Sequence, residues 1–188
     1  RAHYGEHFPI IGLVPALKPA VLQSKSKTVA VLATPATFRG QLIKDVVERF
    51  AQPAQVQVMP ITCLKLVPFV EAGEQMSAAC LQTLREILQP AVDQGADYLV
   101  LGCTHYPFLK PAIQRIFGQK LILIDSGFAV ARQTARILIK NELLFEQDRK
   151  NAVRLACYVS GQNADALRPV LSRLIQPDLT WSINNIGI

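Results

Sequence analysis

The sequence predicts an α/β protein with mainly parallel sheets flanked by helices. Short apolar runs typical of buried strands alternate with segments of helical spacing along most of the chain. Of the 188 residues, 50% are hydrophobic, which is enough for a sizeable core. Strands and helices that alternate in this way form a parallel sheet covered by helices on both faces, with right-handed crossovers.

The individual elements can be placed in order along the chain. We expect strands over the apolar runs Pro9–Leu13, Thr28–Ala33, Val56–Pro60, Tyr98–Leu101, Leu121–Ile124 and Leu155–Ser160. The helices between and after them are expected near Pro15, over Phe38–Phe50, in two stretches between Leu64 and Gln89, and over Phe108–Phe117, Phe128–Leu144 and Ala164–Ile175. The polar stretch Glu146–Asn151 is expected to be a surface loop.

Charge and hydropathy exclude two classes of partner. The formal net charge is +6, but the basic residues are scattered, with no run beyond Arg149-Lys150 and no interleaved aromatic residues. This pattern is typical of a solvated surface, so nucleic-acid binding is not indicated. The sequence contains no apolar stretch near the roughly 18 residues of a membrane span and no signal-peptide pattern, so no membrane partner is expected.

The cysteine pattern favours reduced thiols in the cytoplasm. Cys63, Cys80, Cys103 and Cys157 are widely spaced and form no Cys-x-x-Cys pair. Neither a disulfide framework nor a zinc site is indicated, although a metal site that joins Cys63 to Cys103 and His105 stays open as an alternative. Cys80 and Cys157 fall in a helical stripe and a strand, where structural roles are expected.

Cys103 is the strongest candidate for chemistry. It follows the predicted strand Tyr98–Leu101 and precedes a predicted helix, and such turns present reactive groups outside the carboxyl ends of parallel strands. The amides of a helix start favour the thiolate form of a cysteine beside them. His105 can assist proton transfer to this thiol, although a histidine here can also cap a helix. Thr104 has a capping alternative as well.

A second polar turn is expected at the same edge of the sheet. Thr34 and Thr37 follow the predicted strand Thr28–Ala33 and open the next predicted helix. Their hydroxyls and the neighbouring backbone amides can hold a carboxylate. Ordinary helix capping by Thr37 is the alternative.

Several of these segments resemble the glutamate racemase family, within the aspartate/glutamate racemase superfamily. The stretch from Leu101 through Gly102-Cys103-Thr104-His105-Tyr106-Pro107 to Leu109 looks like its second active-site motif. Similar stretches occur, in order, at Gly12–Ala20, Val31–Thr37, Val67–Glu71, Leu123–Gly127 and Tyr158–Gly161.

The resemblance implies a function and a set of roles. It implies interconversion of L- and D-glutamate by two-cysteine proton transfer without a cofactor, supplying D-glutamate for peptidoglycan. Cys103 would be one acid/base, with His105 and Glu71 beside it, and Thr104, Thr34 and Thr37 would bind the substrate. The sequence has no Gly-x-Gly-x-x-Gly or P-loop pattern, so no cofactor is expected. A homodimer and a peptidoglycan-precursor activator stay open as partners.

The resemblance also predicts the organisation of the chain. The family has two α/β lobes, and its first cysteine lies in a Cys-Asn-Thr motif that this sequence lacks. By analogy that motif falls upstream of Arg1, so we expect a chain that lacks the N-terminal part, with the first lobe incomplete and no racemisation by this segment alone. Residues 1–10 would end the N-terminal part of the first lobe, residues 11–124 would form the second lobe, and residues 125–188 would return to the first.

Three alternatives remain open from the sequence. A racemase of aspartate or of a hydantoin in the same superfamily would share the Cys103 motif. A non-catalytic partner-binding fragment is a second alternative, since some racemases of this family also bind DNA gyrase. A Cys-His acyl-transfer enzyme, in which the thiol attacks a carbonyl, is the third.

Overall fold

The computed structural model describes residues 8–143, 154–160, 164–175 and 179–186. These residues fall into two compact units. The larger unit lies within residues 8–143 without residues 71–73, and the smaller one combines residues 71–73 with the described residues from 154 onward. The stretch Glu146–Asn151, predicted to be a surface loop, lies outside the described residues.

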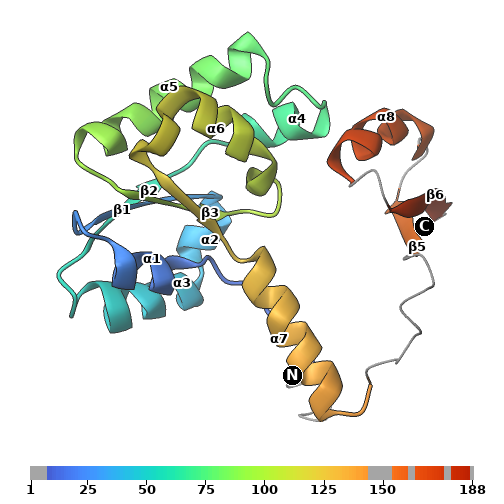
Figure 1. The fold of residues 1–188 in the computed structure, drawn as a ribbon, viewed down its shortest axis with the longest axis horizontal. Helices are drawn as coiled ribbons and strands as arrows, with labels where there is room; N and C mark the ends of the chain where they lie inside the picture. The colour runs from blue at the N-terminus through green and yellow to red at the C-terminus, as the bar shows by residue number, and fades with distance from the viewer. Residues whose placement is uncertain (1–7, 144–153, 161–163, 176–178, 187–188) are drawn as a thin grey trace. The chain divides into compact units, whose positions relative to one another are not determined.

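Four parallel strands form the sheet of the larger unit (Figure 1). They are β1 (Thr28–Ala33), β2 (Gln57–Ile61), β3 (Tyr98–Gly102) and β4 (Ile122–Asp125), and their order across the sheet is β2, β1, β3, β4. Each neighbouring pair is parallel. The predicted parallel α/β class is therefore confirmed.

Helices cover both faces of this sheet, and the last helix of the larger unit extends away from it (Figure 1). They are α1 (Leu17–Gln23), α2 (Pro35–Arg39), α3 (Gln41–Val46), the π-helix Val47–Ala51, α4 (Leu66–Glu71), α5 (Ala78–Asp93), the 3-10 helix Tyr106–Leu109, α6 (Lys110–Phe117), the 3-10 turn Gly118–Lys120 and α7 (Gly127–Lys140). No residue of α7 is buried. Within the described part of the chain, no helix has the length and apolar character needed to cross a bilayer.

Alternation along the buried strands divides the core in two. Leu32 and Leu101 face a cluster that includes apolar residues of α4, α5 and α6, whereas Val31 and Val100 face a cluster with α1, α3 and the π-helix. Successive strand residues point to opposite faces, so a strand buried on both sides needs a continuous apolar run. The fully buried run of β1 shows this pattern.

The smaller unit is a strand–helix–strand arrangement. Strands β5 (Arg154–Ser160) and β6 (Thr180–Ile186) pair in parallel, and α8 (Ala164–Leu174) connects them. The side chain of Asn185 accepts a hydrogen bond from the backbone N–H of Ala164 at 3.1 Å, which joins the start of α8 to β6. The guanidinium of Arg168 lies 5.8 Å from the ring centre of Trp181.

Two strand predictions differ from the structure. Residues 9–13, predicted to be a strand, have no regular structure and pair with no strand among the described residues. β1 pairs with β2 on one side and with β3 on the other, so neither side of β1 is free to pair with residues 9–13. The strand β6 was not predicted, because its apolar residues are few and two asparagines, which are depleted in strands, lie within it.

The predicted helix Phe38–Phe50 is divided in the structure. Gly40 has extended backbone dihedrals, φ −66° and ψ 142°. It is the C-cap residue of α2 and the N-cap residue of α3. A Cβ atom at Gly40 would lie 3.2 Å from the carbonyl oxygen of Thr37, a closer approach than most side chains tolerate. The glycine therefore lets the chain turn sharply just after the polar Thr34–Thr37 segment.

Asp97 fixes the opposite, amino edge of the sheet. Its carboxylate accepts hydrogen bonds from the Ser24 hydroxyl at 2.7 Å and from the backbone N–H groups of Lys25 and Ser26 at 2.7 and 3.0 Å. Burial by itself raises the pKa of the Asp97 carboxyl, but hydrogen bonds from Ser26, Ser24 and Lys25 outweigh it and hold the pKa below its ordinary value. The ionised carboxylate thus joins the turn before β1 to the start of β3.

We expect Asp97→Asn to lower the free energy of unfolding at pH 7 by about 1 to 3 kcal/mol, since an amide replaces a charged acceptor. The folded pKa of Asp97 lies below its unfolded value. Its contribution is therefore present above about pH 4 and is lost as the pH falls through the folded pKa. Urea unfolding between pH 3 and pH 7 should show a weaker loss of stability on acidification in the variant.

The matched control is Asp93→Asn on α5, whose exposed carboxylate accepts a single side-chain hydrogen bond from Gln89. This change should leave the stability within about 0.5 kcal/mol of the parent. Equal acid sensitivity in the parent and in Asp97→Asn would contradict the role assigned to Asp97.

Candidate active site

The site lies at the point in the sheet where the strand order changes direction, between β1 and β3. From β1 the chain crosses to β2 on one side, and it later places β3 on the other side of β1. The connection from β1 to β2 and the connection from β2 to β3 lie on opposite faces, because α3 packs in one core cluster and α5 in the other. Such a reversal opens a crevice at the carboxyl ends of the two central strands, which is where parallel α/β sheets bind ligands.

Strand register brings the two polar turns to this crevice. Ala33, the last residue of β1, pairs with Gly102, the last residue of β3. Thr34 and Cys103 are the next residues of these two strands, so they leave the sheet side by side. The structure thereby brings together two turns that are 69 positions apart in the sequence.

Gly102 allows the close approach that this arrangement requires. A Cβ atom at Gly102 would lie 2.9 Å from the Cβ of Ala33 and 3.2 Å from Cγ of Pro15. Atoms at these distances overlap, so a larger residue would push β3 away from β1 or from the Pro15 segment. The backbone just before Cys103 is therefore held between β1 and the segment that precedes α1.

Cys103 and His105, the predicted acid/base residues, lie close together at this site. Sγ of the half-buried Cys103 lies 3.9 Å from Nδ1 of His105, within hydrogen-bond reach for sulfur. The hydroxyl of Thr104 lies 3.4 Å from the same nitrogen. In the tautomer with a proton on Nε2, the Nδ1 lone pair faces the thiol and can accept its proton. His105 can therefore take the proton from Sγ and return it.

The helix after Cys103 begins differently from the prediction. A 3-10 helix starts at Tyr106 and α6 starts only at Lys110, rather than one helix over Phe108–Phe117. Pro107 and Pro111 explain the delay, since each removes a backbone donor and restricts the residue before it. The N-cap residues of these two helices, His105 and Leu109, make no side-chain capping hydrogen bond.

Thr34 rather than Thr37 caps α2. The Thr34 hydroxyl accepts the backbone N–H of Thr37 at 3.3 Å, and the two hydroxyl oxygens lie 3.1 Å apart. Both side chains are half-buried. The coupled hydroxyls form a small polar surface beside the Cys103 turn.

Glu71 is placed less directly. It is the last residue of α4 and is exposed, and it belongs with residues 72 and 73 to the smaller unit. The predicted role of Glu71 beside Cys103 therefore rests on the resemblance.

The remaining cysteines lie in ordinary surroundings. Cys80 is buried in the core, and burial, with a smaller contribution from Cys63, raises the pKa of its thiol, which favours the neutral form expected of a structural cysteine. Cys157 lies in β5, as predicted. The described residues hold no cluster of three or more His, Cys, Asp or Glu side chains suited to a metal, so the metal alternative at Cys63 has no support there.

The sequence reasoning did not single out two further groups at this edge of the sheet. Asp125 at the end of β4 forms an ion pair with Lys110 of α6 and accepts the Gly127 N–H at 2.7 Å. The Ser126 hydroxyl donates to the carbonyl of Val14 instead of capping α7. Tyr106 is the second group; its place in the Cys103 motif was the only signal.

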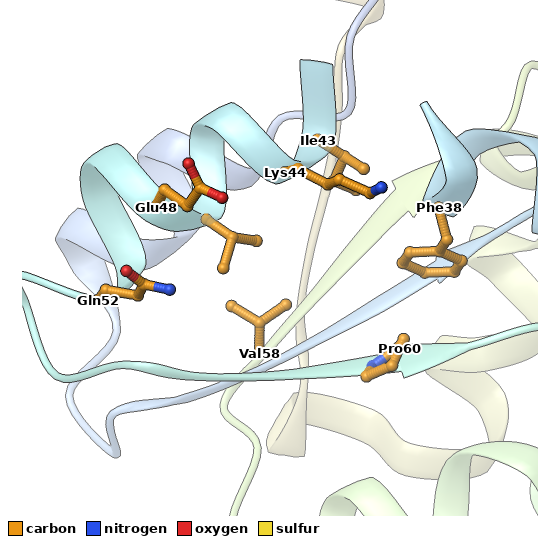
Figure 2. A pocket seen from close by; sticks show the side chains of 8 residues that line it. Phe38, Ile43, Lys44, Glu48, Gln52, Val58 and Pro60 are labelled. Carbon is orange, nitrogen blue, oxygen red and sulfur yellow. The ribbon is translucent and has the colours of Figure 1, made fainter. Parts of the chain in front are cut away.

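A separate cavity of about 260 Å³ lies between β2 and the helical segment formed by α3 and the π-helix (Figure 2). Val58 and Pro60 form its floor, Phe38 closes one end, and Lys44, Glu48 and Gln52 stand at its rim (Figure 2). None of the candidate site residues lines it.

The fold and site define a parallel α/β protein with a cysteine thiol beside a histidine at the reversal point of its sheet. The model of the Asp/Glu/Hydantoin racemase family matches residues 5–134. The chain belongs to this family, so the resemblance inferred from its motifs is confirmed.

The chain is also similar to individual glutamate racemases. Glutamate racemase of Deinococcus radiodurans is 48% identical over 174 residues, and that of Herpetosiphon aurantiacus is 41% identical over 150 residues. These alignments cover 92% and 79% of this chain but only 59% and 58% of the relatives. The chain thus spans less than two thirds of the length of these curated relatives.

The fold agrees with solved structures. One is Escherichia coli glutamate racemase in complex with L-glutamate and the activator UDP-MurNAc-Ala, at a TM-score of 0.75 and 28% identity, covering 98% of this chain and 67% of that one. Another is glutamate racemase from Thermus thermophilus in complex with beta-chloro-D-alanine, at a TM-score of 0.64 and 28% identity, covering 96% and 63%.

We expect Gly102→Ala to lower the free energy of unfolding by about 1 to 3 kcal/mol, because the added methyl group overlaps Ala33 and Pro15. Urea unfolding measures the effect. Gly12→Ala is the matched control, since nothing lies within 4 Å of the Cβ position at Gly12, and it should be nearly neutral. Equal stability of the two variants would show that the close approach at Gly102 is not required.

Proposed function

We propose that the site transfers the α-proton of an amino acid and that the protein is a glutamate racemase. The observation that carries the proposal is the contact between the Cys103 thiol and His105 at the carboxyl edge of β3, beside Thr34 and Thr37. A thiol with a histidine partner suits reversible proton transfer, and coupled hydroxyls beside it suit a carboxylate.

The proposed chemistry moves one proton on each side of the α-carbon. The Cys103 thiolate accepts the α-proton, and the electron pair of the broken C–H bond remains on the α-carbon and spreads into the carboxylate. A proton delivered to the opposite face then gives the mirror-image amino acid. His105 assists by taking and returning the proton at Sγ. Precise placement of the base is essential because the C–H group is a very weak acid.

Substrate binding is assigned to hydroxyl groups. Thr34, Thr37 and Thr104 are proposed to hold the carboxylates of the substrate, which stabilises the charge that develops during proton removal. Glu71 is proposed to lie beside Cys103 in the complete site, as the resemblance implies. No step in this scheme requires a cofactor.

Glutamate is the proposed substrate rather than aspartate or a hydantoin. The family description covers all three, but the similar relatives named above are glutamate racemases, and the Escherichia coli protein was solved with L-glutamate. We propose that the enzyme supplies the cell with D-glutamate for peptidoglycan synthesis. An activator like UDP-MurNAc-Ala and a homodimer are proposed partners.

Two further proposals concern the cellular compartment of the protein and its division into lobes. All four cysteines are unpaired, and a reactive thiol needs a reducing compartment, so we propose that the protein acts in the cytoplasm. We also propose that residues 1–10, 11–124 and 125–188 belong, in turn, to the first, second and first lobes of a two-lobed racemase.

The test follows exchange of the α-proton of L- and D-glutamate in heavy water by NMR, with the protein expressed from its native start codon. We expect exchange with inversion, and we expect Cys103→Ala to slow it by about a hundredfold or more, since general acid–base groups contribute about that much. Cys157→Ala, a cysteine change in β5, is the control and should leave exchange unchanged.

Absence of exchange with glutamate in the parent protein would reject the proposed substrate. Full activity in Cys103→Ala would reject the proposed role of the thiol. Aspartate, tested in parallel, should exchange more slowly than glutamate.

The 188-residue chain by itself is expected not to invert either enantiomer, because a single thiol can serve only one face of the α-carbon. Circular dichroism or chiral chromatography after prolonged incubation measures inversion. The outcome that overturns this expectation is racemisation by the isolated chain.

A further inference from the structure

Tyr106 connects two loops at the carboxyl edge of the sheet. It lies three residues after Cys103, and its side chain has 0% exposure. Its backbone N–H donates to the carbonyl of Cys103 at 3.2 Å, and its phenol hydroxyl donates to the carbonyl of Cys63 at 3.2 Å. Tyr106 therefore donates one hydrogen bond from its backbone to the Cys103 turn and one from its side chain to the Cys63 loop.

These two carbonyls belong to loops that follow strands which are not neighbours. Cys63 follows β2 and Cys103 follows β3, and β1 lies between these two strands in the sheet. No backbone pairing joins β2 to β3. Tyr106 thus joins the turn of the candidate thiol to the loop after the edge strand β2.

Packing holds the ring in place between these bonds. Tyr106 lies in the core cluster that contains Leu66 of α4 and Leu109 of the 3-10 helix. A ring that is fully enclosed has few orientations available, so the hydroxyl is directed at Cys63 and the loops cannot shift independently.

The phenol is suited to holding a position and not to moving a proton. Burial, with smaller contributions from Cys103 and Cys63, raises the pKa of Tyr106 to about 12. The hydroxyl therefore stays protonated at physiological pH and remains a hydrogen-bond donor. A proton carrier for the same reaction would need a pKa near the working pH.

We propose that Tyr106 is a positioning residue: its phenol hydroxyl fixes the Cys103–His105 turn against the Cys63 loop, so that the thiol is held at the α-carbon of the substrate. This inference rests on the proposed racemase function for its kinetic consequence. Its structural consequence is independent of the substrate, because it concerns only how firmly the turn is held.

The test compares two changes that each remove one buried phenol hydroxyl. Tyr106→Phe keeps the ring and its packing, and the Cys63 carbonyl keeps the Leu66 N–H, at 3.4 Å, as a donor. Tyr98→Phe is the matched control: Tyr98 is 7% exposed, lies at the amino end of β3, the strand that leads into the Cys103 turn, and donates to Gln23 at 3.3 Å. Both variants should show similar decreases in Tm.

Only Tyr106→Phe should change catalysis. In the protein expressed from its native start codon, we expect kcat for glutamate to fall tenfold or more with KM within about twofold of the parent, because a displacement of the base by about 1 Å is enough to cause losses of this size. Tyr98→Phe should leave both constants unchanged. A general loss of stability would affect the two variants alike, so the contrast isolates the position of the hydroxyl.

Hydrogen exchange of the backbone gives a readout that does not depend on the substrate. Peptides covering residues 102–109 and 62–66 should exchange several-fold faster in Tyr106→Phe and at the parent rate in Tyr98→Phe. If the parent protein fails to act on glutamate, the proposed function is rejected while this arm still decides the positioning role. Unchanged exchange and unchanged kcat in Tyr106→Phe would overturn the proposal.

Discussion

The parallel pairing of β1 with β3 is the constraint on which the site depends. It aligns Ala33 with Gly102, and the missing side chain of Gly102 lets β3 approach both β1 and Pro15. Because both strands end at the same level, the threonine turn and the cysteine turn leave the sheet together. The crossing of the chain from β1 to β2, and later to β3, makes this the one reversal point in the order of the four-stranded sheet.

Tyrosine hydroxyls and charged side chains stabilise the two edges of this sheet in different ways. At the amino edge, the ionised Asp97 joins the turn before β1 to the start of β3, and Tyr98 donates to Gln23 of α1. At the carboxyl edge, Tyr106 joins the loops after β2 and β3, and Lys110 pairs with Asp125 of β4. The carboxyl edge, where chemistry is proposed, is therefore held by contacts that leave Cys103 and His105 partly accessible.

Much of the site could be predicted from local sequence because its residues fall in one short motif. Cys103, Thr104 and His105 are adjacent, so any turn after the strand brings them near one another. The helix start inferred to activate the thiol was less predictable, since Pro107 and Pro111 delay α6 to Lys110. Capping of α2 by Thr34 instead of Thr37 was missed because both threonines suit the position and only the backbone conformation distinguishes them.

The sequence by itself determined the parallel α/β class, most of the strands and helices, and the motif that holds the candidate thiol, because periodicity and local motifs are properties of neighbouring residues. Only the tertiary structure decided that residues 9–13 pair with no strand in the described part of the chain and that Thr34 lies beside Cys103. It also decided that Tyr106 reaches Cys63. These features depend on strand order and register, which arise from the packing of distant segments and leave no periodic signal in any one of them.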